Sequence, residues 1–189
     1  MRRALVLILG VTAVACSQPA PPPAPPPPPP STAIVSSLKG GYEMMKGYVT
    51  QAAEQIPEAK YSYQPTKDVR TIGQLIGHIA DANHLICGYS SGQAGPATSA
   101  EKSMTKKADL QKALADSFAF CDKAYAAMTN DAVGGQDVTM TIINNMKTTR
   151  AGAFAFNSAH DMEHYGNLVT YMRMNKMVPP SSAPPAPPK

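Results

Sequence analysis

Three of the four histidines in the chain have a spacing that suits a metal site. His160 and His164 are four residues apart in an apolar-periodic segment, so on a helix they lie about 40° apart on one face. Two imidazoles at this spacing can bind one metal ion. His78 lies near the inward face of another helical segment and would supply a third imidazole. His84 is rotated by about 240° from His78, so we expect it to be a surface or loop-packing residue.

Histidines at this spacing also occur without a metal. Two helical histidines often lie on a polar face by chance, or are buried and satisfied by hydrogen bonds. The third histidine favours a ligand set, and three imidazoles leave one position of a divalent metal open, which is the catalytic arrangement. Nitrogen ligands suit Zn, Ni, Cu or Fe, and of these we expect Zn or Ni. The predicted ligands are His78, His160 and His164.

Three further side chains lie close enough in the sequence to assist such a metal. Asp81 is three residues after His78, and Glu163 directly precedes His164, so each is a candidate to orient an imidazole or to move a proton. Each also fits a solvated charge on a helix surface. Tyr171 is seven residues after His164 on the same face, and it either lines the pocket or packs in the core, which we favour.

Positioning these residues requires long helices, and the hydrophobic pattern predicts four. Apolar residues recur at helical spacing over residues 33–56, 71–88, 106–128 and 149–174. Thr71 and Gln74 form a capping-box pattern at the start of the second helix, and Gly88 is its expected end. Residues 89–105 form a long connection, and residues 130–148 indicate a loop with one short helical turn and no strand pair. The predicted fold class is all-α, a four-helix bundle.

Length and composition allow a single folded domain. Residues 33–178 remain after an apolar N-terminal segment and two tails, which hold sixteen of the 19 prolines. One core suits this length, so large multidomain enzymes and repeat arrays are excluded. The formal net charge is +4 and falls to +2 without Arg2 and Arg3. The chain has no basic stripe, so nucleic acid is not an expected partner.

The first fifteen residues have the form of a secretory signal peptide. Arg2 and Arg3 precede an apolar run of about twelve residues, which is too short to span a bilayer. Small residues then precede Cys16, as in the lipobox of a bacterial lipoprotein, with ordinary cleavage after Ala15 as the alternative. We therefore expect secretion across the inner membrane and a lipid anchor at the cell envelope or in the periplasm. We expect residues 16–32 to be a proline-rich tether and residues 179–189 a disordered tail.

Two stretches of the chain, residues 56–88 and 157–180, resemble the DinB-like (YfiT-like) metalloenzyme family. The matching elements are a Tyr-x-x-x-Pro then Gly-x-x-x-x-His run and a His-x-x-x-His-x-Gly block, and the resemblance extends over residues 33–178. It implies an up-down-down-up bundle with a long crossover between the second and third helices. It also implies a divalent metal bound by His78, His160 and His164.

The resemblance also bears on the reaction and on the cysteines. Some relatives transfer groups to or from low-molecular-weight thiols such as mycothiol or bacillithiol. Many carry Arg-Gly-Gln after the last histidine, where this chain has Tyr165-Gly166-Asn167, so a substrate role of that Arg or Gln is not carried over. Parallel second and third helices would place Cys87 and Cys121 at the same height, which leaves a disulfide and two buried thiols as alternatives.

Two functions follow as hypotheses. The first is a metal-dependent transferase or hydrolase at the cell envelope, with thiol-linked chemistry. The second is a non-catalytic, metal-stabilised binding or stress-response module. The expected partners are a metal ion, a small-molecule thiol or other small substrate, the membrane through a lipid on Cys16, and a second copy of the chain in a homodimer.

Overall fold

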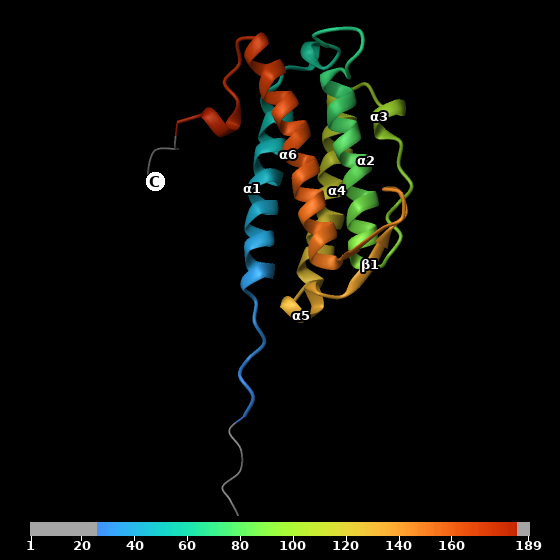
Figure 1. Cartoon of the computed structure of the whole chain (residues 1–189). Helices are drawn as coiled ribbons and strands as arrows, with labels where there is room; N and C mark the ends of the chain where they lie inside the picture. The colour runs from blue at the N-terminus through green and yellow to red at the C-terminus, as the bar shows by residue number, and fades with distance from the viewer. Residues whose placement is uncertain (1–25, 185–189) are drawn as a thin grey trace, which may run out of the picture.

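Four long helices packed side by side form the body of the molecule. The computed structural model describes residues 26–184, so the expected signal peptide (1–15) and Cys16 lie outside the described residues. The long helices are α1 (Ala33–Gln55), α2 (Ile72–Ser91), α4 (Lys107–Ala127) and α6 (Arg150–Met174). Figure 1 shows them running up, down, down and up, so the expected four-helix bundle and its topology are confirmed.

The hydrophobic core fills the space between these helices. The ring of Tyr42 on α1 stacks on Tyr125 of α4 with 4.0 Å between the centroids, and Phe154 of α6 packs against the same Tyr125 ring. Full burial of a large apolar side chain stabilises a fold by about 1.5–3 kcal/mol. Among residues 26–184, no helix is both long and apolar enough to cross a membrane.

Helix α2 begins where the sequence predicts and ends one turn later. The hydroxyl of Thr71 accepts a hydrogen bond from the backbone N–H of Gln74, whose side chain accepts one from the N–H of Thr71, so the capping box is confirmed. Gly88, the expected end, lies inside the helix. The chain turns instead at Gly92, where a φ of 72° lies in the left-handed region that glycine adopts without strain.

A long crossover, residues 92–106, joins α2 to α4 and runs back along α2 (Figure 1), as the sequence predicts. It contains one short helix, α3 (Ala100–Ser103), which packs on α2. The carboxylate of Asp81 on α2 accepts hydrogen bonds from the backbone N–H groups of Ala100 and Glu101, at 2.9 and 3.0 Å. Asp81 therefore fixes where the start of α3 lies against α2.

The segment between α4 and α6 contains a β-hairpin. The short helix α5 (Asp131–Gly134) confirms the expected helical turn. After it, β1 (Asp137–Met140) and β2 (Met146–Thr149) pair antiparallel, with Met140 opposite Met146. The prediction of no strand pair was therefore wrong, because strands of four residues are too short to show a clear alternation of apolar and polar residues.

The hairpin is held by its turn and by one anchor residue. Asn144 and Asn145 have φ values of 50° and 57°, which asparagine adopts more readily than most residues. Met140 at the end of β1 is fully buried and packs in a small apolar cluster with Ile86 of α2 and Ala153 of α6. The hairpin turn therefore lies fixed against the α2–α6 side of the bundle.

The first residues of the C-terminal tail are ordered. Residues 180–182 form a 3-10 helix whose Pro180 is buried. The hydroxyl of Tyr165 donates a hydrogen bond to Oγ of Ser181 at 2.8 Å and accepts one from the backbone N–H of Ser181 at 2.9 Å. The structure thus has a 3-10 helix within the tail that the sequence predicts to be disordered, because a proline-rich composition does not reveal a partner such as Tyr165. Residues 185–189 lie outside the described residues.

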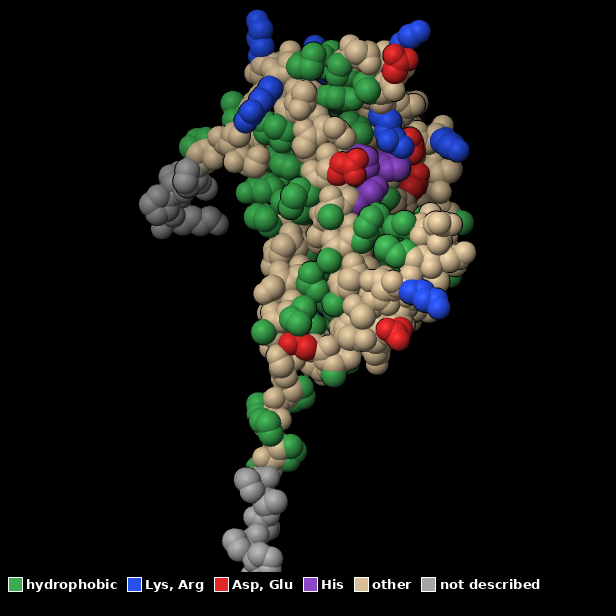
Figure 2. Space-filling view, viewed as in Figure 1, with side chains coloured by type: hydrophobic (Ala, Val, Ile, Leu, Met, Phe, Trp, Pro, Cys, Tyr) green, Lys and Arg blue, Asp and Glu red, His purple; other side chains and the backbone are tan. Residues whose placement is uncertain are grey.

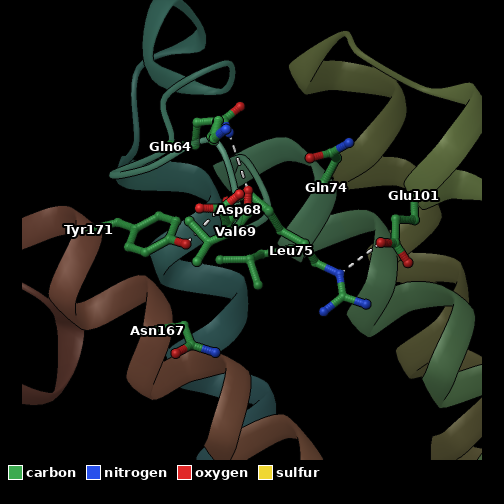
Figure 3. Close-up of a pocket in the computed structure, with 10 residues that line it drawn as sticks. Gln64, Asp68, Val69, Gln74, Leu75, Glu101, Asn167 and Tyr171 are labelled. Carbon is green, nitrogen blue, oxygen red and sulfur yellow. Dashed lines mark hydrogen bonds and ion pairs between the residues drawn. The ribbon is translucent and has the colours of Figure 1, made fainter.

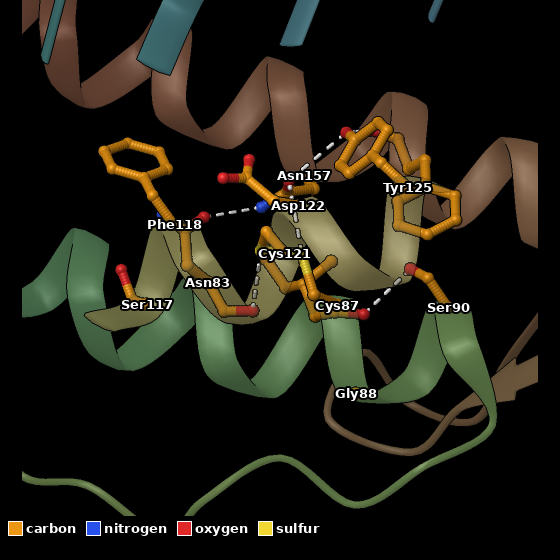
Figure 4. Close-up of a disulfide and its surroundings, with 12 residues drawn as sticks. Asn83, Cys87, Gly88, Ser90, Ser117, Phe118, Cys121, Asp122, Tyr125 and Asn157 are labelled. Atoms are coloured by element: carbon orange, nitrogen blue, oxygen red, sulfur yellow. Dashed lines mark hydrogen bonds between the residues drawn. A yellow bond between two sulfur atoms is a disulfide. The ribbon is translucent and has the colours of Figure 1, made fainter. Parts of the chain in front are cut away.

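A disulfide joins Cys87 of α2 to Cys121 of α4, with 5.4 Å between the Cα atoms (Figure 4). Because the two helices run parallel, both cysteines lie at the same height. Of the two alternatives left by the sequence, the structure has the disulfide. Next to it, the side-chain amide of Asn157 on α6 donates a hydrogen bond of 2.7 Å to Oδ1 of Asn83 on α2.

Candidate metal centre

Three imidazoles meet where α2 faces α6. His78 comes from α2, and His160 and His164 come from successive turns of α6. One ring nitrogen of each lies within 4.8 Å of the other two. Nε2 of His160 is 3.3 Å from Nε2 of His78 and 3.1 Å from Nε2 of His164. The structure thus brings together the three residues that the sequence selects.

The distances within this histidine cluster suit nitrogens that share one cation. Zn–N bonds are about 2.0–2.1 Å long, so two ligands of a tetrahedral zinc lie about 3.3 Å apart. The measured separations of 3.1 and 3.3 Å agree with that value. Among residues 26–184, no fourth His, Cys, Asp or Glu joins the group. The cluster therefore fits a divalent metal with one coordination position left for water or substrate.

Glu101 fixes the orientation of His78 and was not anticipated from the sequence. Its Oε2 lies 2.8 Å from Nδ1 of His78, and its Oε1 accepts a 2.7 Å hydrogen bond from Nε of Arg70. Because a carboxylate only accepts hydrogen bonds, Nδ1 carries the proton, and Nε2 presents its lone pair to the cluster. Burial opposes ionisation of Glu101, but the hydrogen bonds from Arg70 and His78 outweigh it, and the pKa of this carboxyl is lowered.

Glu101 reaches His78 because α3 lies tightly against α2. A Cβ atom at Gly77 would come within 2.6 Å of the backbone nitrogen of Glu101, so only glycine allows this approach. Asp81 holds the other side of the contact through its bonds to the start of α3. Asp81 is thus neither a solvated charge nor a direct partner of an imidazole, and it acts through Glu101. The one sequence signal was Gly77, a glycine inside a helical pattern beside a candidate ligand.

Burial keeps the imidazoles of α6 in the neutral form. It lowers the pKa of His160 from 6.5 to about 4, with smaller contributions from the neighbouring His164 and His78. Burial also lowers the pKa of His164, and His78 lowers it further. The neutral imidazole is the form that binds a metal, so these two residues are ready to act as ligands at pH 7.

The other residues selected from the sequence lie outside the cluster. Glu163 is exposed and makes no hydrogen bond to any described residue, so it fits the solvated charge. The hydroxyl of Tyr171 donates to the backbone carbonyl of Arg70 at 3.1 Å, while its ring is 7% exposed. His84 is buried, packs edge-on against Phe120, and has Gly95 of the crossover against its backbone carbonyl. Of the two expected positions, the surface one was therefore wrong, and packing against a loop agrees with the structure. The reason is that α4, α6 and the crossover cover α2 on several sides.

A polar cavity of about 620 Å³ opens beside the cluster. Figure 3 shows Asn167 and Tyr171 on α6 facing Leu75 of α2 and Glu101 of α3 across it. The polar side chains that line it include three amides, two cations and two carboxylates, namely Gln64, Gln74, Asn167, Lys67, Arg70, Asp68 and Glu101. The cavity is therefore suited to a polar molecule with hydroxyl, amide or charged groups.

Residues 165–167, where the chain departs from the family pattern, divide between two sides of α6. The ring of Tyr165 stacks on Tyr48 of α1 with 5.3 Å between the centroids, and its hydroxyl binds Ser181, so it lies away from the histidines. Asn167 lines the polar cavity, with Nδ2 3.5 Å from Nδ1 of His164. Of the two residues that differ from the family pattern, Tyr165 and Asn167, only Asn167 therefore faces the candidate site.

The cluster is reachable from solvent. Figure 2 shows the histidines at the surface of one face, with acidic and basic side chains beside them and hydrophobic side chains directly below. His78 and His160 are half-buried and His164 is buried. A small molecule can therefore approach the histidines without passing through the core.

This bundle with a three-histidine centre belongs to a known family. A family model of the DinB superfamily matches residues 42–168, and the chain is a member of that superfamily. A DinB-like protein from Bacillus cereus is 12% identical and superposes with a TM-score of 0.67 over 77% of this chain and 95% of that one. A DinB-like protein from Bacillus subtilis is 21% identical, with a TM-score of 0.55 over 78% of this chain and 94% of the other.

A mycothiol-dependent maleylpyruvate isomerase is also similar in structure. It is 14% identical, with a TM-score of 0.57 over 71% of this chain and 60% of the isomerase. Identities at this level show a shared fold and nothing about a shared reaction. No curated protein matches the sequence.

Proposed function

We propose that this protein is a metal-dependent transferase or hydrolase in which His78, His160 and His164 hold a divalent transition metal, with Zn or Ni as the first candidates. The observation that carries the proposal is the convergence of three ring nitrogens on a solvent-reachable face. A structural zinc site has four protein ligands, whereas a catalytic site has three and keeps one position open. Three ligands therefore favour catalysis over a purely structural role.

The residues around the cluster prepare it for this chemistry. A metal bound there would lower the pKa of a coordinated water or thiol and make a nucleophile available at neutral pH. Glu101 keeps the proton on Nδ1 of His78, and a carboxylate in this position raises the basicity of the imidazole. Arg70 lies at the edge of the polar cavity, where its Nε is paired with Glu101 and the rest of its guanidinium can donate hydrogen bonds to a substrate.

A thiol-linked reaction is the form of this function that we favour. Low-molecular-weight thiols carry many hydroxyl, amide and carboxylate groups, and the polar cavity offers the amides of Gln64, Gln74 and Asn167 together with the cations of Lys67 and Arg70. A structural neighbour with this fold is a mycothiol-dependent isomerase, so a thiol co-substrate is compatible with the fold. In this arrangement the thiol lies in the polar cavity with its sulfur directed to the histidines.

We further propose that the domain is held at the cell envelope by a lipid on Cys16. The small residues before Cys16 support it, as does the disulfide, since disulfides persist in oxidising compartments. Residues 26–30 are exposed and extend away from α1, which suits a tether (Figure 1). A radioactive fatty acid should label the wild-type protein and not the Cys16→Ser variant. An unlabelled wild-type protein would contradict the anchor.

Elemental analysis with one ligand variant and one matched variant tests the metal centre. The wild-type chain should retain one equivalent of Zn or Ni after gel filtration. His160→Ala should lose the metal and any thiol-transfer or hydrolytic activity. His84→Gln, which alters a buried histidine outside the cluster, should keep both.

The outcomes separate the two hypotheses. If the site only stabilises the fold, His160→Ala lowers the melting temperature of the metal-loaded protein, and no activity is found in the wild type. If His160→Ala keeps full metal stoichiometry, the histidine cluster is not the metal site, and both hypotheses are wrong.

A further inference from the structure

A second cavity, of about 380 Å³, borders the histidine cluster, and its walls are mostly apolar. His78 and His160 are among the residues that line it. Four segments that are distant in the sequence supply the rest: α2, the crossover, the hairpin turn and α6. The main apolar contributions come from Leu85, Ile86, Pro96, Ile142, Ile143 and Phe156.

The charge of this apolar cavity differs from that of the polar cavity. No Lys or Arg is among its lining residues, whereas Lys67 and Arg70 line the polar one. Its only acidic residue is Asp81, and both oxygens of that carboxylate already accept backbone hydrogen bonds from α3. The side chains of this cavity offer an anionic group no positive partner, so only a metal at the histidine end could serve one, and a cation would find a carboxylate that is already engaged.

The rim of the apolar cavity is exposed to water although it is hydrophobic. Leu85 is 44% exposed and Ile142 is 45% exposed. Figure 2 shows hydrophobic side chains gathered directly next to the histidines on this face. The hairpin turn that carries Ile142 is fixed by the buried Met140 and by a hydrogen bond between the hydroxyls of Tyr89 and Thr141. The cavity wall is therefore built into the fold, and its filling would remove apolar surface from water.

We infer that this apolar cavity binds the hydrophobic part of an uncharged small organic molecule, aromatic or branched aliphatic, whose polar end faces His160. The volume lies at the small end of the range of about 300–1,000 Å³ that is typical of ligand pockets, so the occupant is a small molecule rather than a protein segment. This inference rests on the proposed function and deepens it, since it names the class of the second substrate, while the thiol occupies the polar cavity.

The direct test is calorimetric titration of the purified full-length, metal-free chain with indole and with indole-5-carboxylate. The two probes share one ring system and differ by a negative charge. Indole should bind at least about tenfold more tightly than the carboxylate, because both probes bury the same ring but only the carboxylate would lose its hydration without gaining a positive partner. Equal binding of both probes, or no binding of indole, would overturn the inference.

Two matched variants locate the bound probe. Ala82 lines the apolar cavity, and Ala113 lines a separate cavity of similar volume next to His84; both are half-buried helical alanines. Ala82→Phe should fill the first cavity and weaken indole binding at least about tenfold, while Ala113→Phe should leave it unchanged. The reverse pattern would show that indole binds in the other cavity and would overturn the inference.

A third variant and a metal titration complete the test. If Ala82→Phe does not fold, Leu85→Asp decides instead, since this exposed rim position tolerates a charge that should weaken indole binding. Cobalt titration of the same samples reports the metal centre separately. Cobalt binding without indole binding overturns the cavity inference and leaves the proposed function intact. Indole binding without cobalt binding overturns the proposed function and supports the cavity.

Discussion

Two clusters of polar side chains lie between α2 and α6, and they differ in how their polar atoms are paired. Near the disulfide, Asn157 donates to Asn83, and the hydroxyl of Tyr125 donates to the carbonyl of Phe154 at 2.9 Å. One turn further along α6, the histidine cluster presents three ring nitrogens to one another. In the asparagine pair, an amide N–H donor faces an amide oxygen acceptor. In the histidine cluster, the Nε2 atoms of His78 and His164 both face Nε2 of His160, so nitrogen lone pairs come together.

The difference explains which of the two groups is structural. A donor next to an acceptor satisfies a buried polar group, and the hydrogen bond from Asn157 to Oδ1 of Asn83 does this within the protein, although Nδ2 of Asn83 has no partner among the described residues. Three neutral imidazoles cannot satisfy each other in the same way, because their converging nitrogens lack enough protons. Such a cluster is complete only when a cation or another partner occupies its centre. We therefore expect changes near the asparagines to alter stability and changes near the histidines to alter binding.

The largest expected effect is on stability and comes from the disulfide. The bridge closes a loop with a sequence separation of 34 residues, and a loop of this length corresponds to about 3–4 kcal/mol of stabilisation through the unfolded chain. The double variant Cys87→Ala/Cys121→Ala should lose about this much free energy of unfolding in urea titrations of the metal-free protein. Its cobalt affinity should change by less than about threefold. If the variant loses cobalt affinity together with stability, the disulfide region and the histidine cluster are not independent.

A smaller effect, on binding alone, is expected at Glu101. Loss of the carboxylate that orients a metal-ligating histidine typically weakens metal affinity about 10–100-fold. Glu101→Gln should show this loss in cobalt titration, while the free energy of unfolding of the metal-free protein changes by less than about 1 kcal/mol, because the ion pair is partly exposed.

The matched control is Glu163→Gln. This variant removes an exposed carboxylate next to His164 that has no described hydrogen-bond partner. It should leave cobalt affinity nearly unchanged. If Glu101→Gln and Glu163→Gln lost cobalt affinity equally, the cause would be a general effect of charge and not the specific hydrogen bond from His78 to Glu101.

The smallest effect concerns pH and a histidine outside both groups. Burial lowers the pKa of His84 below 6.5, so between pH 6.5 and that lowered value the unfolded chain binds a proton that the folded chain does not. Acidification below pH 6.5 therefore reduces the free energy of unfolding, by at most about 1.4 kcal/mol per pH unit for one group. His84→Gln should lose less stability between pH 7 and pH 5 in urea titrations. An unchanged slope would assign the pH dependence to other groups.

The sequence predicts the four helices and the convergence of the three histidines well because both depend on periodicity. A spacing of four residues on α6 fixes the relative direction of His160 and His164 whatever the rest of the chain does. The partner on α2 requires only that the two helices face each other, which an amphipathic bundle ensures.

The features that the sequence does not predict depend on contacts between distant segments. Glu101 lies beside lysines in a polar connection, and only the close approach of α3 at Gly77 and the bonds from Asp81 bring it to His78. Likewise, Ile142 and Ile143 reach the histidines only because the hairpin folds back onto the bundle. The helices that carry the histidines can therefore be predicted from the sequence. The residues that hydrogen-bond to the histidines and those that form the cavity walls cannot.

The covalent bridge has a consequence for motion at the site. It ties α2 to α4 nine residues after His78, so the helix that carries one imidazole moves only together with its neighbour. Helix α6, which carries the other two imidazoles, has no such covalent tether and is held by side-chain packing and hydrogen bonds. Adjustment of the centre to different cations or to entering molecules is thus easiest as a small displacement of α6 against a rigid α2–α4 pair.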